Sequence, residues 1–348
     1  MENFNSFWKG KNVLITGHTG FKGAWLSLIL KNLDANIFGV SKEKYNSGFY
    51  FETGLDQMYE EEYLLDLSEE KQVHKLSTKV ENKGIDIVFH FAAQAIVSQS
   101  FISPLETIKA NTLGTYLISN LVNQLSEPKV LVIATTDKVY KDHSKKNKEN
   151  DELGGEDIYS SSKASAELLT HAFINSFKRE SLNISTVRSG NVLGGGDIGK
   201  NRLVPDIINS LKSSKDIIIR NPESTRPWQS IFDSIHGYLK VGYFNYFDQN
   251  VDSWNINSEL NNKYTVKEIV DMLLKLWGGD TKVIVDSNQT FHESKLLNLD
   301  SSKAEKNLDW LPMYDMHATL EDVVNWEKSE SKEHYSNKTI QSFLEKII

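Results

Sequence analysis

Two short segments carry side chains that could exchange protons with a substrate. Tyr159 and Lys163 are four residues apart in a predicted helix, so they lie on the same face of it. A cation close to a phenol lowers the pKa of the phenol, which would make Tyr159 a usable base toward a hydroxyl group. In isolation, such a pair is more often an exposed helical pair than a catalytic one.

The second segment, Thr-Asp-Lys at 136–138, follows an apolar run at 130–134. The run predicts a buried strand, and ligands bind at the carboxyl ends of the strands in parallel sheets. Asp137 and Lys138 could neutralise each other as an ion pair, or they could serve as an acid and a base. Because the pair at 159 and 163 follows one loop later, we expect the two segments to form one catalytic site.

A glycine-rich turn near the start of the chain could hold phosphate groups. Its glycines recur at every third position between an apolar run at 13–15 and a predicted helix. Such a turn brings the N–H groups of a helix N-terminus close to the pyrophosphate of a dinucleotide. Close packing of the helix on the sheet is the rival explanation of these glycines. The cofactor-binding residues predicted here are Gly17, Thr19, Gly20, Phe21, Lys22 and Gly23.

The residues after the second predicted strand leave the type of cofactor open. A carboxylate usually binds the ribose hydroxyls at this point, but the chain has Ser-Lys-Glu-Lys at 41–44. Glu43 could serve NAD, whereas either lysine could accept the 2′-phosphate of NADP, and an exposed charged turn is equally compatible. Asp66 and Leu67 follow a third short strand and could contact adenine, or Asp66 could only cap a helix. We expect NAD and leave NADP open.

The elements that must position these residues alternate along the first part of the chain. Short apolar runs lie at 13–15, 37–40, 85–91, 130–134 and 184–187, and helical patterns at 107–125 and 159–177 separate the later ones. This alternation predicts an α/β fold with a Rossmann-type, doubly wound parallel sheet.

The chain after residue 190 has a different character. Glycine, proline and tryptophan are frequent at 191–197 and 220–229, which is typical of irregular chain that faces a ligand. Thr265 and Glu268 predict a capping box for a helix that the glycines at 278–279 can end. We expect a dinucleotide-binding domain at 1–190 and 231–258, and a smaller, discontinuous C-terminal substrate domain at 191–230 and 259–348.

Composition excludes several classes of protein. The chain has 348 residues, with 39 Lys and Arg against 47 Asp and Glu, and its net charge of −8 argues against nucleic-acid binding. No apolar run approaches the ~18–20 residues of a membrane span, and no secretory leader begins the chain, so we expect a cytoplasmic protein without a membrane partner. The chain has no cysteine, and His292 has no second histidine at ligand spacing. We therefore predict no metal site.

Several motifs together resemble the extended short-chain dehydrogenase/reductase family, whose members act on nucleotide sugars. The resemblance rests on the glycine turn, Phe-Ala-Ala-Gln at 91–94, the Tyr159/Lys163 pair and Arg-Ser-Gly-Asn at 188–191. Within this family, six segments resemble CDP-glucose 4,6-dehydratases; they lie at 17–26, 135–140, 153–168, 190–197, 220–229 and 292–304. The chain departs from the usual Thr-Ser-Asp-Lys-Cys-Tyr at two positions, where it has Thr136 and Val139.

The resemblance implies a role for each candidate residue. Tyr159, assisted by Lys163 and Thr136, would remove the proton of the C4 hydroxyl. Asp137 would protonate the departing C6 hydroxyl, and Lys138 would take the C5 proton. The remaining cofactor contacts would come from Asp66, Leu67, Phe91, Ala92, Ala93, Tyr159 and Lys163. The substrate would contact Gln94, Asn191, Arg202, Leu203, Arg220 and Arg226, although each arginine could instead form a salt bridge between segments.

The activity that the resemblance implies is the conversion of CDP-glucose to CDP-4-keto-6-deoxyglucose by an NAD-dependent hydro-lyase. The product would feed deoxysugar synthesis, for example for a lipopolysaccharide O-antigen. Another nucleotide-sugar 4,6-dehydratase or a 4-epimerase is the alternative, and a cofactor-binding sensor without activity is a remote one. Related enzymes pair the helices that correspond to 104–125 and 158–178 in a four-helix bundle, which implies a homodimer, with a tetramer as the alternative.

Overall fold

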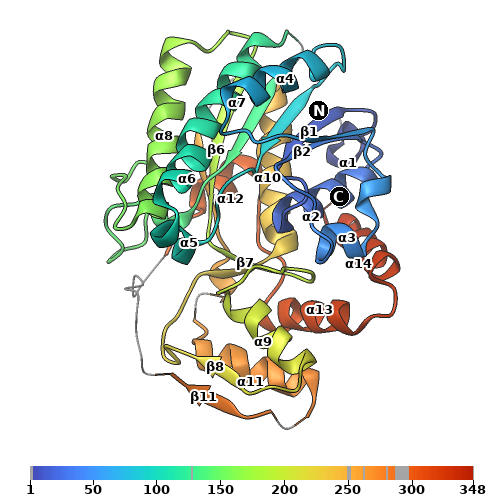
Figure 1. Cartoon of the computed structure of the whole chain (residues 1–348), viewed down its shortest axis with the longest axis vertical. Coiled ribbons are helices and arrows are strands. Elements are labelled where there is room, and N and C mark those ends of the chain that lie inside the picture. Colours follow the sequence, from blue (N-terminus) through green and yellow to red (C-terminus); the bar gives the residue numbers. More distant parts are fainter. Residues whose placement is uncertain are drawn as a thin grey trace.

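The computed structural model describes residues 3–126, 128–248, 252–261, 263–279, 281–286 and 298–347. His292 and the first residues of the segment at 292–304 lie outside these ranges. The chain forms a larger body around a parallel sheet and a smaller body at one end of it (Figure 1).

The sheet of the larger body is parallel throughout its seven strands. Its order is β10-β6-β5-β4-β1-β2-β3. The strands are β1 (Asn12–Thr16), β2 (Asn36–Ser41), β3 (Glu61–Leu64), β4 (Ile87–His90), β5 (Val130–Ala134), β6 (Asn183–Ser189) and β10 (Ser253–Ile256). The strand order reverses beside β1, where β2 lies on one side and β4 on the other. The predicted doubly wound sheet is confirmed, and such a reversal opens a crevice at the carboxyl ends of the strands.

Helices cover both faces of this sheet. They are α1 (Phe4–Phe7), α2 (Phe21–Asn32), α3 (Phe49–Glu52), α4 (Glu70–Val80), α5 (Val97–Ile102), α6 (Pro104–Ile108), the π-helical turn η2 (Lys109–Leu113), α7 (Gly114–Gln124), α8 (Ile158–Ser176), α10 (Ile231–Phe247), α12 (Ser302–Leu308) and α14 (Lys332–Lys346). Three short 3₁₀ turns are η1 (Leu55–Gln57), η3 (Asp137–Val139) and η4 (Glu259–Asn261).

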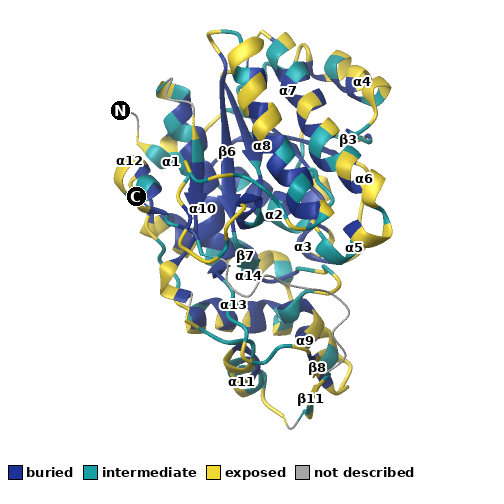
Figure 2. Ribbon diagram, turned by 90° about the vertical axis from the view of Figure 1, so that its left-hand side faces the viewer, coloured by how far each residue is buried: buried dark blue, intermediate teal, exposed yellow. Residues whose placement is uncertain are grey.

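Successive side chains of each strand point to opposite faces of the sheet, and the larger body therefore has two apolar layers, one on each face. Val13 and Ile15 of β1 pack in one cluster with α2, α10 and α14, whereas Leu14 packs in the other with α4 and α7. Successive residues of a strand point to opposite faces, so a strand that is covered on both sides is apolar throughout. Figure 2 shows the result: β6 is buried throughout, most of α10 is buried, and exposed residues gather on the outer sides of the helices.

The smaller body has a core of its own. It contains β7 (Asn191–Leu193), α9 (Leu203–Lys212), β8 (Ile217–Ile219), β9 (Trp228–Ser230), α11 (Val266–Trp277), β11 (Val283–Val285) and α13 (Met316–Lys328). Ile208, Ile217 and Leu273 are buried together in this core. The predicted capping box is confirmed, because Thr265 N–H donates to Glu268 at 2.7 Å and Glu268 N–H donates to Thr265 at 3.2 Å.

Candidate active site

One large cavity follows the carboxyl ends of the sheet strands and continues along the smaller body. Its volume is about 1510 Å³, larger than the ~300–1,000 Å³ of a typical small-molecule site. Every predicted catalytic, cofactor-binding and substrate-binding residue lines it, whereas Lys44, suggested only as a possible partner of a 2′-phosphate, does not. The fold therefore gathers side chains that are separated by more than 200 positions in the chain, from Gly17 to Arg226.

The glycine turn forms the wall of the cavity at the start of α2. Gly17 has a φ of 71°, and a Cβ atom there would lie 2.7 Å from the Ala92 nitrogen. A Cβ atom on Gly23 would collide with the Gly17 carbonyl oxygen. Both positions need glycine, because β1, α2 and the chain after β4 approach one another closely here. The turn presents the N-terminus of α2 to the cavity, an arrangement that suits a pyrophosphate group.

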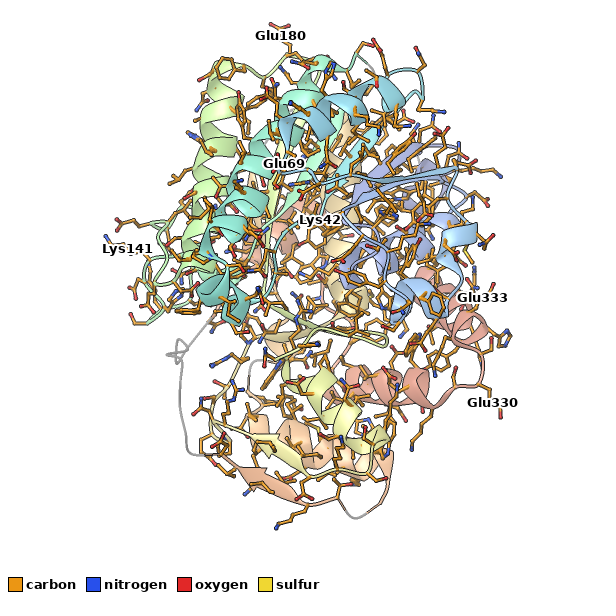
Figure 3. The ribbon with its side chains drawn as sticks, in the orientation of Figure 1. Lys42, Glu69, Lys141, Glu180, Glu330 and Glu333 are labelled. Carbon is orange, nitrogen blue, oxygen red and sulfur yellow. The ribbon has the colours of Figure 1, made fainter. Side chains whose placement is uncertain are left out.

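Both lysines at the end of β2 are paired with carboxylates. Lys42, which is labelled in Figure 3, contacts Asp66 at 2.9 Å, and Lys44 pairs with Glu62. Burial favours a higher pKa for Asp66, but Lys42 and Ser68 outweigh it and lower the pKa. A phosphate at this point would have to compete with these carboxylates for the lysines.

Asp137 is held in the turn directly after β5. Its Oδ1 accepts a hydrogen bond of 2.9 Å from the Thr136 hydroxyl, and its Oδ2 has no hydrogen-bond partner among the described residues. Burial raises the pKa of Asp137, although Lys138, Thr136 and Lys22 act against this effect. The carboxyl group therefore keeps its proton at higher pH than a free aspartic acid, which suits a general acid.

Tyr159 and Lys163 occupy the first two turns of α8. Lys163 Nζ donates to the Ala134 carbonyl at 3.0 Å, at the end of β5. Burial raises the pKa of Tyr159 to about 12, although the hydrogen bond with Thr136 lowers it. The sequence led us to expect a lowered pKa; the buried position of the phenol outweighs any effect of the lysine. Burial also lowers the pKa of Lys163 to about 8, with Glu167 acting in the opposite direction.

Lys22 reaches the same part of the cavity from the glycine turn. Its Nζ lies 3.4 Å from Ser189 Oγ. Burial lowers the pKa of Lys22 to about 7, and the nearby charge of Arg202 lowers it further, while Asp137 acts in the opposite direction. Sequence reasoning treated Lys22 only as a cofactor contact and did not indicate its altered pKa.

The arginines of the smaller body face the other end of the cavity. Arg202 pairs with Asp197 at 2.9 Å, and Arg226 donates to the Thr225 carbonyl at 2.9 Å. Sequence reasoning left open whether Arg202 contacts a ligand or forms a salt bridge, and the structure contains the salt bridge. Asp197 was not singled out, although it ends the glycine-rich segment at 191–197.

Asn111 is a structural residue of the site that sequence reasoning missed. Its side chain accepts from Gln94 N–H at 2.8 Å and donates to the Gln94 carbonyl at 3.0 Å and to Ser162 Oγ at 2.9 Å. It lies in the π-helical turn η2, within the segment predicted as one continuous helix. The only available signal was a polar residue within an apolar helical pattern. Asn111 connects the chain after β4 to α8.

The described part of the chain has neither a metal-binding cluster nor a helix that could span a membrane. No group of three or more histidine, aspartate or glutamate residues there could hold a metal ion. No helix in those same ranges is both long and apolar enough to cross a bilayer.

Comparison with known proteins assigns the chain to a family. The sequence pattern described as GDP-mannose 4,6 dehydratase matches residues 14–323. The chain belongs to this family. A curated relative, the CDP-glucose 4,6-dehydratase of Salmonella typhimurium, is 37% identical over 334 residues, which cover 93% of this chain and 92% of the relative. The UDP-glucose 4-epimerase of Rickettsia bellii is 28% identical, over 65% of this chain and 60% of its own length.

Solved structures show the fold of this dehydratase-family chain independently. A dTDP-glucose 4,6-dehydratase from Streptomyces venezuelae, solved with NAD, has a TM-score of 0.78 at 20% identity and covers 92% of this chain and 97% of its own. A UDP-glucuronic acid 4-epimerase from Bacillus cereus, also solved with NAD, has a TM-score of 0.78 at 21% identity, over 91% and 99%. The resemblance to the extended short-chain dehydrogenase/reductase family is confirmed.

Proposed function

We propose that the protein is a CDP-glucose 4,6-dehydratase. The observation that carries this proposal is the position of Asp137 and Lys138, which open into the same cavity as Tyr159 and Lys163. An epimerase that only oxidises and reduces C4 has no use for an additional acid and base. The Salmonella typhimurium relative acts on CDP-glucose, which supports cytidine as the base of the nucleotide.

NAD is the proposed cofactor, and the cavity has the features that it needs. The glycine turn suits the pyrophosphate, and the pairing of Lys42 and Lys44 with carboxylates favours ribose hydroxyls over a 2′-phosphate. Bound NAD would supply an acceptor for the hydride from C4 and a donor that returns it to C6. The proposed contacts are Gly17, Thr19, Gly20, Phe21, Lys22, Gly23, Asp66, Leu67, Phe91, Ala92, Ala93, Tyr159 and Lys163.

The remaining chemistry is proton transfer by side chains of this chain. The pKa of about 12 keeps the Tyr159 phenol protonated in the protein without cofactor, and the positive charges of Lys163 and of a bound nicotinamide would favour the phenolate. In that form Tyr159 takes the proton of the C4 hydroxyl, and Lys163 and Thr136 orient it. The resulting 4-ketone acidifies C5. Lys138 then removes the C5 proton while Asp137, which burial keeps protonated to higher pH, donates a proton to the departing C6 hydroxyl. Water leaves, and C5 regains a proton when C6 is reduced.

The substrate diphosphate would lie toward the smaller body. Guanidinium groups suit phosphate oxygens, which they bind with two parallel hydrogen bonds. The proposed substrate contacts are Gln94, Asn191, Arg202, Leu203, Arg220 and Arg226. We assign 1–190 and 231–258 to dinucleotide binding, and 191–230 with the described parts of 259–348 other than α12 and α14 to the sugar side of the site. The helices α12 and α14 lie within the predicted substrate domain but pack on the larger body, so we assign them to that body.

We propose a homodimer in the cytoplasm. Large apolar side chains are exposed on α5, α6 and α8 and at the residue that follows α8; these three helices pack beside one another in the larger body. Ile102, Leu105, Leu168 and Phe177 are 74%, 64%, 59% and 65% exposed. Exposed apolar side chains of this size on neighbouring helices are typical of a protein interface. A second copy of the chain could cover it with the same helices.

The direct test is an incubation of the purified protein with NAD and, separately, CDP-, dTDP-, UDP- and GDP-glucose. We expect a product that is lighter than CDP-glucose by one water molecule, detected by mass spectrometry. If one of the other three nucleotide sugars loses water and CDP-glucose does not, that nucleotide sugar is the substrate in place of CDP-glucose. A change of stereochemistry at C4 without loss of mass would identify an epimerase.

A further inference from the structure

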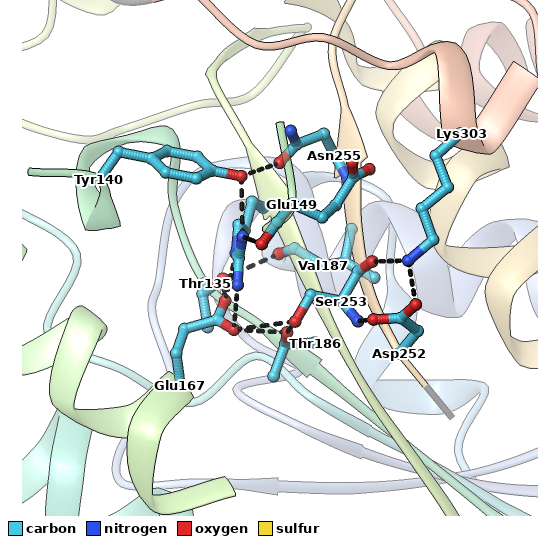
Figure 4. A network of polar contacts seen from close by, with 11 residues as sticks. Thr135, Tyr140, Glu149, Glu167, Thr186, Val187, Asp252, Ser253, Asn255 and Lys303 are labelled. Carbon is cyan, nitrogen blue, oxygen red and sulfur yellow. Dashed lines mark hydrogen bonds and ion pairs between the residues drawn. The ribbon is translucent and has the colours of Figure 1, made fainter. Parts of the chain in front are cut away.

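A buried ion pair lies directly behind the cavity, and the proposed chemistry does not use it. Arg188 of β6 donates to both carboxylate oxygens of Glu167 of α8, from Nε at 3.0 Å and from Nη2 at 2.9 Å (Figure 4). Only 2% of Arg188 and 4% of Glu167 is exposed. Burying such a pair brings little net stability compared with apolar side chains, so stability alone does not account for it.

The carboxylate of Glu167 is hydrogen-bonded to the residue that follows β5. Thr135 Oγ1 donates to Glu167 Oε1 at 2.5 Å, and Thr136 is the next residue. One helical turn before Glu167, Lys163 donates to the carbonyl of Ala134. Consecutive turns of α8 therefore hold consecutive residues at the end of β5.

Glu167 remains a hydrogen-bond acceptor because of its surroundings. Burial alone would raise its pKa, but Arg188 and the hydroxyls of Thr135 and Thr186 hold the pKa below its ordinary value. The bond from Thr135 therefore persists over the pH range in which an enzyme works.

The guanidinium group of Arg188 is hydrogen-bonded to residues that follow the catalytic segment 136–138 in the chain. Arg188 Nη1 donates to the Tyr140 hydroxyl at 2.8 Å and to the Glu149 carbonyl at 2.9 Å. The Tyr140 hydroxyl donates in turn to Asn255 at 2.7 Å. Tyr140 directly follows η3, so the ion pair fixes the chain before Thr136 and after that turn.

We propose that Glu167 and Arg188 are positioning residues, which set the placement of the segment 136–138 against the Tyr159/Lys163 pair on α8. This inference rests on the proposed dehydratase function. Neither residue lines the cavity, so their effect would pass through Thr135 and Tyr140. Because the proposed substrate contacts lie elsewhere, a loosened segment should lower kcat much more than it changes KM.

The structure offers a matched pair of substitutions for the test. Thr135 and Thr186 donate to the same carboxylate at 2.5 and 2.6 Å, but only Thr135 adjoins the catalytic segment, and Thr186 does not line the cavity. Thr135→Val and Thr186→Val each remove one hydroxyl and leave the ion pair in place, so both variants should fold. Thermal unfolding gives the effect of each substitution on stability.

With CDP-glucose as substrate, we expect Thr135→Val to lower kcat by about tenfold or more and to change KM by less than about threefold. Thr186→Val should keep kcat within about twofold of the wild type, with a similar decrease in Tm. Tyr140→Phe, which removes the contact at the other end of the segment, should act in the same direction as Thr135→Val.

Two results would overturn the inference alone: an unchanged kcat in Thr135→Val, or equal decreases in kcat for both threonine variants at equal loss of stability. A wild-type protein that converts no nucleotide sugar would overturn the proposed function and the inference with it.

Discussion

Lys22 should couple NAD binding to proton uptake. Its pKa is about 7 in the protein without ligand, so about half of the Lys22 amines are neutral at pH 7. A bound pyrophosphate favours the ammonium form, so NAD binding should take up about 0.5 proton per site at this pH. Lys163, with a pKa of about 8, adds only about 0.1 proton. The affinity for NAD should therefore fall as the pH rises through 7 and above.

Calorimetric titration in two buffers of different ionisation enthalpy measures this uptake directly. Lys22→Met should reduce it to about 0.1 proton per site at pH 7. Lys240→Met is the matched control, because burial also lowers the pKa of Lys240 but this residue does not line the cavity. Binding without proton uptake by the wild type, or equal uptake by Lys22→Met, would refute the assignment of Lys22 as a contact of the bound cofactor.

Three further outcomes test the other assignments. Tyr159→Phe should lower kcat by about 100-fold or more, while its affinity for CDP-glucose, measured by calorimetry, should stay within about threefold of the wild type. A loss of affinity as large as the loss of kcat would contradict the role of Tyr159 as the base. Asp137→Asn combined with Lys138→Met should still oxidise C4, so absorbance near 340 nm should rise on adding CDP-glucose; near-normal formation of the dehydrated product would assign the elimination to other residues. The wild type should sediment as a dimer and Leu105→Glu with Leu168→Glu as a species near 39.6 kDa, whereas a wild-type monomer would contradict the proposed dimer.

The sheet and the convergence of the candidate residues could be predicted because both follow from local pattern. Apolar runs indicate buried parallel strands, and the carboxyl ends of such strands meet at one edge. For this reason the sequence alone predicts that Gly17, Thr136 and Tyr159 share one site, and all three line the same cavity.

Tertiary contacts account for what the sequence did not indicate. The pKa of Tyr159 depends on how completely the phenol is buried, which helical spacing does not reveal. Asn111, in the π-helical turn, bonds to Gln94 and Ser162, which lie 17 and 51 positions away in the chain, so its partners could not be recognised from the local pattern. Arg188 was only part of a motif in the sequence, and its buried partner Glu167 became visible when β6 and α8 were placed together.

The fate of the hydrogen at C4 separates a 4,6-dehydratase from a 4-epimerase most directly. CDP-glucose that carries deuterium at C4 is incubated with the protein and NAD, and the product is analysed by mass spectrometry and NMR. We predict a 4-keto-6-deoxy product with the deuterium at C6. Deuterium that returns to C4 in an epimerised sugar, or the absence of any conversion, would contradict the proposed function.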